Sequence, residues 1–356
     1  MKSKLFTTTV VGSMPRPQYV KDLVEGSVTG DISASEFQRS MDEAVPLVAQ
    51  MQEVAGIDII SDGEWRRKSY VGIIADICYG FQVSIREVDG QRQTWHIVTG
   101  EVKLKDPGLL AREARFLKSV TDRPIKVALP SPYLLGERMW HPQLSIEAYP
   151  TKRDFTEALV PVLREELMAL RDEGVEFAQI DDPHLCLFVD PQVRSSYADP
   201  EGEIYYCVDM LNRMVEGVDG IRVALHLCRR NKGRSGWSGE GGYGPIMPAL
   251  QQLNLDMVML EFAMPAAGDK AILGELPRHM DIGLGCVDCR SAHIDTPGEI
   301  VARVKEVLEY VAPERLVLHP DCGFSPGSAA DIPLDEAYLK LCNEAAAARV
   351  LRDEYG

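Results

Sequence analysis

Eight short apolar runs, separated by longer segments with helical periodicity, constrain the fold of this 356-residue chain more than any other feature. The runs are rich in Val, Ile, Leu, Met and Ala with little alternation, which is typical of strands that helices cover on both faces. They occupy residues 7–13, 57–64, 125–132, 177–183, 222–228, 257–263, 279–288 and 316–323. Because parallel strands need crossover helices between them, the pattern predicts an α/β protein with the architecture of a (β/α)8 TIM barrel.

The segments between the runs carry helix signals. Residues 33–54 and 153–170 place apolar side chains at spacings of three and four, as amphipathic helices do. Asp199 and Thr296 are each followed by a proline, which predicts that each is an N-cap with proline at the first helical position.

Residues 81–105 depart from this alternation of strands and helices. Their side chains alternate between apolar and polar around an Asp-Gly pair, which predicts a β-hairpin inserted between the second and third strands. No linker or repeat interrupts the chain, so we expect residues 1–356 to form a single TIM-barrel domain. A doubly wound open sheet is the alternative, although no G-x-G-x-x-G turn follows a strand.

The net charge of the chain indicates which classes of binding partner are disfavoured. The chain has 38 Lys and Arg against 54 Asp and Glu, a net charge of -16, which disfavours a broad surface for nucleic acid or an anionic membrane. No signal peptide or apolar stretch of about 18 residues is present, so we expect a cytoplasmic protein. The 8 cysteines are too few for a disulfide scaffold and are expected to be free thiols or metal ligands.

Polar residues gather at the carboxyl ends of the predicted strands, where barrel enzymes place their active sites. These residues are Ser13, Asp62, Glu64, Ser131, Asp181, Asp182, His226, Cys228, Glu261, Asp288, Asp321 and Cys322. Because each costs free energy to bury unless it is paired or bound to a metal, a convergent ring of them indicates a functional site.

Four of these residues form a possible metal set, namely His226, Cys228, Glu261 and Cys322. His226 and Cys228 are two residues apart and therefore lie on the same side of a strand. Nitrogen, thiolate and carboxylate ligands suit zinc better than magnesium or calcium.

Two other interpretations of these residues remain open. His226 could be a hydrogen-bonded barrel histidine and the two cysteines small core residues, because free cysteine is commonly buried. Cys286 and Cys289 form a Cys-x-x-Cys unit, a rival metal or redox pair.

Several motifs together resemble a known family. They are VGSMPRP at 11–17, DGEWRR at 62–67, QIDDP at 179–183, HLC at 226–228, the glutamate of LEFA at 261 and HPDCG at 319–323. In this order, and over almost the whole chain, they resemble the catalytic barrel of cobalamin-independent methionine synthase. The resemblance also extends to single-barrel relatives in the superfamily that contains uroporphyrinogen decarboxylase.

The resemblance implies a zinc-dependent methyl or alkyl transferase that activates a small, homocysteine-like thiol as a zinc thiolate. It implies that zinc is bound at the positions of His226, Cys228, Glu261 and Cys322. The positions that would hold the amino-acid thiol are Val11, Gly12, Ser13, Glu64 and Asp181.

The chain departs from the family pattern in places that concern the methyl donor. The resemblance covers only one of the two barrels of full-length methionine synthases, and Leu187 lies near the place of a folate-contacting glutamate. Arg290 takes the place of a proton-donating histidine, and His293, three residues on, could replace it. We therefore keep Asp288, Arg290 and His293 as candidate catalytic residues and leave open a folate, a corrinoid or another donor.

Basic residues on loops at the same end of the predicted barrel indicate an anionic substrate, because guanidinium groups suit carboxylate, sulfonate or phosphate. They are Arg66, Arg67, Arg229, Arg230, Lys232, Arg234 and Arg290. Of these, Arg66 and Arg229 are candidate substrate contacts, together with Tyr243 of the stretch SGWSGEGGYGPI that follows HLCRRN. The plain alternative is a solvated charged loop.

The partners expected are therefore a small thiol and a small alkyl donor, with no nucleic acid and no membrane. Whether the chain forms a homo-oligomer is left open. Alternative activities are attack of the thiol on an epoxide, another C–S lyase reaction, or a decarboxylase-like lyase on the same barrel. A non-catalytic binding protein is the remaining alternative.

Overall fold

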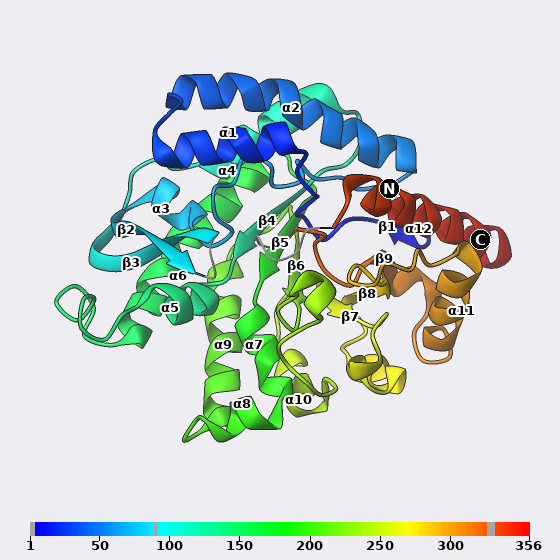
Figure 1. The fold of residues 1–356 in the computed structure, drawn as a ribbon. Helices are drawn as coiled ribbons and strands as arrows, with labels where there is room; N and C mark the ends of the chain where they lie inside the picture. The colour runs from blue at the N-terminus through cyan, green and yellow to red at the C-terminus, as the bar shows by residue number, and fades with distance from the viewer. Residues whose placement is uncertain (1–3, 89–90, 326–331) are drawn as a thin grey trace.

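Seven parallel strands form a curled sheet at the centre of the protein, in the order β1-β9-β8-β7-β6-β5-β4 (Figure 1). This is seen in a computed structural model that describes residues 4–88, 91–325 and 332–356. The strands are β1 Thr7–Thr8, β4 Lys126–Pro130, β5 Phe177–Asp181, β6 Arg222–Leu227, β7 Met257–Glu261, β8 Asp281–Val287 and β9 Leu316–Pro320. Each lies within a run predicted as a strand.

The remaining predicted strand, 57–64, closes the ring between β1 and β4. It makes single parallel bridges, Thr9 with Ile59 and Ile60 with Ile125. The Asp58 carboxylate accepts the backbone N–H of Thr8 at 3.0 Å, so a side chain replaces part of the regular ladder there. The TIM-barrel prediction is confirmed, with bridges in place of a full second strand.

Helices surround the sheet (Figure 1). They are α1 Gln18–Thr29, α2 Ala34–Ala55, α3 Ile73–Ile77, α4 Leu109–Val120, α5 Pro132–Met139, α6 Lys152–Asp172, α7 Pro183–Cys186, α8 Pro191–Ser195, α9 Pro200–Val215, α10 Met247–Leu250, α11 Pro297–Val307 and α12 Leu334–Tyr355. The predicted caps are confirmed, because Asp199 caps α9 and Thr296 begins α11 with a capping box. No helix in the described ranges is long and apolar enough to span a membrane.

The predicted hairpin is present between the ring-closing segment and β4. Its antiparallel strands are β2 Cys78–Val88 and β3 Gln91–Leu104, so it begins three residues before the predicted start. β3 packs against α5 and α6, outside the barrel (Figure 1). The Asp-Gly turn expected at its tip lies outside the described residues.

The barrel interior changes from apolar to polar along the strands. A small cluster separate from the main core contains Val11, Phe177, Ala224, Met257, Met259 and Val317. Side chains on a strand repeat with a period of two, so residues two or four positions further along point to the same side. Gln179 and Asp181 follow Phe177 in this way, and His226 follows Ala224. The apolar residues therefore form a floor beneath a polar rim at the carboxyl ends.

Candidate active site

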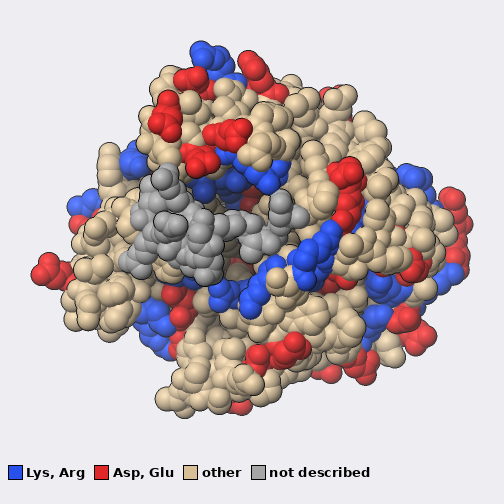
Figure 2. Space-filling view, in the orientation of Figure 1, with Lys and Arg blue, Asp and Glu red and all other residues tan. Residues whose placement is uncertain are grey.

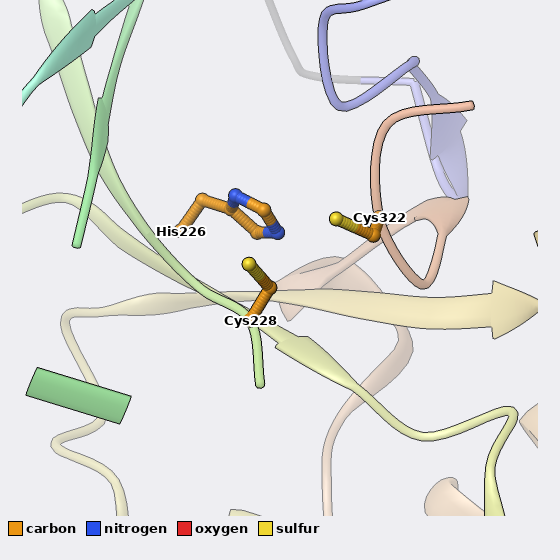
Figure 3. Close-up of side chains that lie close together, drawn as sticks. All are labelled: His226, Cys228 and Cys322. Carbon is orange, nitrogen blue, oxygen red and sulfur yellow. The ribbon is translucent and has the colours of Figure 1, made fainter. Parts of the chain in front are cut away.

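Three metal-ligating side chains meet at this rim. The ligand atoms of His226, Cys228 and Cys322 all lie within 4.8 Å of one another, and the three residues are buried. His226 lies on β6, Cys228 follows the last residue of β6, and Cys322 lies just after β9. Figure 3 shows the imidazole ring and the two sulfur atoms turned toward a common point. The structure thus brings together three of the four predicted ligands.

The imidazole of His226 is oriented for a metal. Its Nδ1 lies 2.8 Å from Oδ1 of Asp181, whereas its buried Nε2 has no hydrogen-bond partner among the described residues. Metal-binding histidines commonly bond a carboxylate through the ring nitrogen that does not bind the ion. Burial disfavours the imidazolium, but the contact with Asp181 and the nearby sulfur of Cys228 raise the pKa of His226.

The two thiols form an unequal pair. The Cys322 thiol donates a hydrogen bond to Cys228, which lowers the pKa of Cys228 to about 7 against the effect of burial. The same contact raises the pKa of Cys322. One thiolate is thus accessible near neutral pH, and a nitrogen with two sulfurs suits a soft divalent metal.

Glu261, the fourth predicted ligand, does not belong to this group. Its Oε2 accepts the backbone N–H of Arg229 at 2.8 Å and the Nη1 of Arg229 at 3.2 Å. Its Oε1 accepts a hydrogen bond from Nη2 of Arg290. The carboxylate is thus held by two buried guanidinium groups.

Two of the predicted substrate contacts, Arg229 and Tyr243, are buried and engaged within the protein. Arg229 donates to the carbonyl of Gly241 at 2.8 Å and to the Tyr243 hydroxyl at 3.0 Å. The Tyr243 hydroxyl in turn accepts the backbone N–H of Glu261 at 2.9 Å. In this arrangement both residues support Glu261, and neither offers a free polar group to a substrate.

Arg66, the other predicted basic contact, is directed toward the helices. It donates to Asp42 of α2 at 2.7 Å, and its guanidinium stacks 4.6 Å from the ring centre of Phe116 of α4. This ion pair and stack bury the guanidinium of Arg66 against α2 and α4.

The predicted amino-acid site lies beside the metal-ligating group. A Cβ on Gly12 would lie 2.4 Å from Oε1 of Glu64, so only glycine lets that carboxylate approach the backbone. Similarly, a Cβ on Gly323, next to Cys322, would lie 2.2 Å from Oγ of Ser13. Val11 belongs to the apolar floor.

Glu64 is held in an unusual state. Its φ of 57° is a left-handed conformation that non-glycine residues seldom adopt, and such strain concentrates at functional sites. Burial raises the pKa of Glu64, Arg67 opposes this change, and the charge of Asp181 adds to it. Glu64 and Asp181 therefore interact electrostatically at the rim.

Two residues that sequence reasoning missed complete this side of the site. Arg16 donates hydrogen bonds of 2.6 Å to the carbonyls of Glu64 and Arg67 and so holds the turn of DGEWRR. The Tyr70 hydroxyl forms a hydrogen bond with the Asp181 side chain. Burial, together with nearby negative charges, raises the pKa of the Tyr70 phenol. Arg16 is part of the VGSMPRP motif, which could have indicated it, whereas no motif includes Tyr70.

The loop after β8 places the three candidate catalytic residues differently. The Asp288 carboxylate accepts the backbone N–H of Arg290 at 2.7 Å and so shapes the turn. Arg290 points inward to Glu261 and lies 3.3 Å from Asp321. The side chain of His293 is 59% exposed, and its Nε2 lies 3.0 Å from Glu299 of α11. The structure does not bring His293 to the rim.

The rival Cys-x-x-Cys pair is buried as free thiols. Within the described ranges, neither Cys286 nor Cys289 belongs to a group of potential metal ligands. Asn231 contacts Cys289 at 3.6 Å, and burial raises the pKa of the Cys289 thiol to about 12. Both cysteines have the environment of core residues.

A parallel barrel with a His-Cys-Cys group at its carboxyl-end rim defines the class of protein, a barrel with a candidate thiol-rich metal centre. Residues 6–349 match the sequence model of the family described as the catalytic domain of cobalamin-independent synthase. The chain therefore belongs to this family of methyltransferases, and the resemblance predicted from its motifs is confirmed.

Relatives support this assignment over nearly the full chain. The chain is 26% identical to a methionine synthase of Sulfurisphaera tokodaii, over 98% of this chain and 94% of the relative. It is 28% identical to a methionine synthase of Sulfolobus acidocaldarius, over 98% of this chain and 93% of the relative. A B12-independent methionine synthase of a Shewanella species, solved with selenomethionine, has a TM-score of 0.79 at 23% identity and 98% coverage of both chains.

Proposed function

We propose that the protein transfers a methyl group to the thiol of a homocysteine-like amino acid at a zinc site formed by His226, Cys228 and Cys322. The observation that carries this proposal is the buried Nε2 of His226, which faces two thiols and has no hydrogen-bond partner in the described part of the chain. Family membership supports thiol methylation, and both archaeal relatives described above bear the name methionine synthase.

The donor atoms fit zinc. A bound zinc ion would lower the pKa of a substrate thiol, which is about 8.5 when free, so that the thiolate predominates near neutral pH. Asp181 keeps the proton of the imidazole on Nδ1 and leaves the lone pair of Nε2 free. All three side chains are buried, and as thiolates the two cysteines would supply negative charge to the ion.

We place the amino-acid part of the substrate against Glu64, Asp181 and Ser13. Carboxylates bind an ammonium group through charge-assisted hydrogen bonds. Asp181 already accepts a bond of 2.7 Å from Gln179 and contacts His226, but a carboxylate has about four acceptor positions. The electrostatic repulsion between Glu64 and Asp181 would be relieved by a bound ammonium group.

We place an anionic methyl donor at the loop that follows β6. Arg230 and Lys232, two and four residues after Cys228, are exposed, and Arg230 has a left-handed φ of 59°. Figure 2 shows Lys and Arg side chains bordering a recess on the face in view, although the whole chain is acidic. An anion entering here would meet positive charge close to the thiol.

Replacement of Cys322 tests the proposed function. The wild-type protein should carry about one zinc ion per chain and form methionine from homocysteine with a methyl-folate or methyl-corrinoid donor. Cys322→Ala should lose zinc and more than about 100-fold of the activity, because a direct ligand is removed. Elemental analysis and turnover measure both quantities.

Cys342→Ala is the matched control, because Cys342 is a half-buried cysteine on α12 outside the rim. This variant should keep zinc and activity. A Cys322→Ala protein with stoichiometric zinc and full turnover would refute the proposal.

A further inference from the structure

Lys126 and Gln179 form a polar connection inside the barrel, below the proposed amino-acid site. Both side chains are buried, and they lie on the neighbouring strands β4 and β5. Nζ of Lys126 donates to Oε1 of Gln179 at 2.8 Å, and Nε2 of Gln179 donates to Oδ1 of Asp181 at 2.7 Å. Burial of an amine and an amide costs free energy that an apolar pair would not, so the connection indicates a role beyond filling space.

The two contacts fix the direction of the Gln179 amide. A side-chain amide donates at its nitrogen and accepts at its oxygen, whereas a carboxylate only accepts. The nitrogen end must therefore face Asp181, and the oxygen end then faces the donor on Lys126. Replacement of Lys126 by an apolar residue would remove this donor and leave the amide less firmly oriented.

The contacts also use the two oxygens of Asp181 unequally. Oδ1 accepts the hydrogen bond from Gln179 and lies 2.8 Å from Nδ1 of His226. Because one carboxylate oxygen has about two acceptor positions, these two contacts occupy Oδ1. The side chain also forms a hydrogen bond with the Tyr70 hydroxyl. The remaining capacity to accept a hydrogen bond from a substrate is therefore on Oδ2.

Lys126 also contacts the other segment of the proposed amino-acid site. Its Nζ donates a second hydrogen bond, to the carbonyl oxygen of Val10. Val10 directly precedes residues 11–13, the segment predicted to hold the amino-acid thiol. One buried amine thus connects this segment with Asp181 through Gln179, and it should keep the two parts of the site at a fixed separation.

We propose that Gln179 and Lys126 are positioning residues for recognition of the substrate's amino group. Gln179 holds Asp181 so that Oδ2 is presented to the ammonium group, and Lys126 holds both Gln179 and the start of residues 11–13. Both residues act through other groups and are not substrate contacts. This inference rests on the proposed function and deepens it, because it makes the site selective for thiols that carry an amino group.

Calorimetric titration of the zinc-loaded protein with two thiols tests this role. L-Homocysteine and 4-sulfanylbutanoate differ only in the amino group. The wild-type protein should bind homocysteine about 10- to 100-fold more tightly, the range expected for hydrogen bonds to a charged group. A residue with a purely structural role would alter the affinity for both thiols alike.

Gln179→Glu is the informative variant, because glutamate has the size of glutamine and can still accept the bond from Lys126. As a carboxylate it cannot donate to Asp181 and repels it. We expect its affinity for homocysteine to fall about tenfold or more, with the affinity for 4-sulfanylbutanoate within about threefold of wild type. Lys126→Met should lower the preference for homocysteine in the same direction but by less, since Gln179 is retained.

Gln38→Glu is the matched control. Gln38 also donates to an aspartate, at 3.1 Å to Asp42, but on the exposed surface of α2. This variant should keep the wild-type preference. An unchanged preference in Gln179→Glu, an equal loss for both thiols, or a wild-type protein without a preference would overturn this inference alone. A zinc-loaded wild-type protein that does not bind homocysteine would overturn the proposed function as well.

Discussion

Lys126 is a fully buried lysine inside the barrel, below the candidate active site. Its Nζ donates to the carbonyl of Val10 and, at 2.8 Å, to the side-chain oxygen of Gln179, which in turn donates to Asp181 at 2.7 Å. Burial lowers the pKa of Lys126 to about 7, although Asp181, Glu64 and Glu344 oppose the change. A neutral amine has two N–H groups, which match these two acceptors.

This burial predicts a pH-dependent stability difference. Between about pH 7 and the ordinary lysine value of 10.5, the unfolded chain binds a proton at Lys126 that the folded chain does not. The destabilising contribution is therefore complete below pH 7 and is relieved as the pH rises, by up to about 1.4 kcal/mol per pH unit. Lys126→Met should lack this slope when denaturant unfolding of the metal-free proteins is compared from pH 7 to 9.5.

The exposed Lys68 supplies the control for this comparison. Lys68→Met should follow the wild-type dependence on pH. Equal slopes for wild type and Lys126→Met would show that Lys126 keeps its proton inside the barrel.

At the scale of elements, the start of α6 illustrates local control of a helix. The Thr151 hydroxyl accepts the N–H of Asp154 at 3.1 Å, and the Asp154 carboxylate accepts the N–H of Thr151 at 2.8 Å. This capping box satisfies two backbone donors at the exposed start of a 21-residue helix. The same helix buries Phe155, Leu159 and Leu163.

Loss of this cap should weaken the fold without touching the active site. Thr151→Ala is expected to lower the free energy of unfolding by about 1 kcal/mol, because an N–H at the helix start loses its acceptor. Urea denaturation measures the change, and Glu43→Gln on the exposed surface of α2 should leave stability unaltered. A Thr151→Ala protein as stable as wild type would contradict this role of the cap.

At the scale of the whole molecule, the last helix, α12, packs against β1 and β9 where the barrel closes (Figure 1). Arg352 on α12 donates at 2.7 Å to the carbonyls of both Leu5 and Phe6, and it also contacts the Asp58 carboxylate. One guanidinium thus connects the last helix, the two residues directly before the first strand, and the bridging segment that replaces a regular second strand.

Removal of that connection should destabilise the entire barrel. Arg352→Ala is expected to lower the free energy of unfolding by about 2–3 kcal/mol, since several charge-assisted hydrogen bonds are lost together. Arg349→Ala, on the exposed surface of the same helix, should cost far less. Thermal and denaturant unfolding compare the two variants, and equal losses would argue against a special role for Arg352.

The sequence by itself determined the barrel and most of its rim. Apolar runs and helix caps are local patterns, and the parallel topology then carries each strand end, from Ser13 to Cys322, to the same face. This local information predicted the positions of His226 and Cys228 on one side of β6, because a strand repeats every two residues.

Only the tertiary structure determines which partner each polar side chain contacts. The Glu261 carboxylate, for example, is paired with the buried guanidinium groups of Arg229 and Arg290, and its place at the end of β7 does not indicate this pairing. Similarly, Arg66 is paired with Asp42 of α2, and the exposed His293 contacts Glu299 of α11. These pairings form between charged groups that are distant in sequence and adjacent only after folding, so no local sequence pattern predicts them.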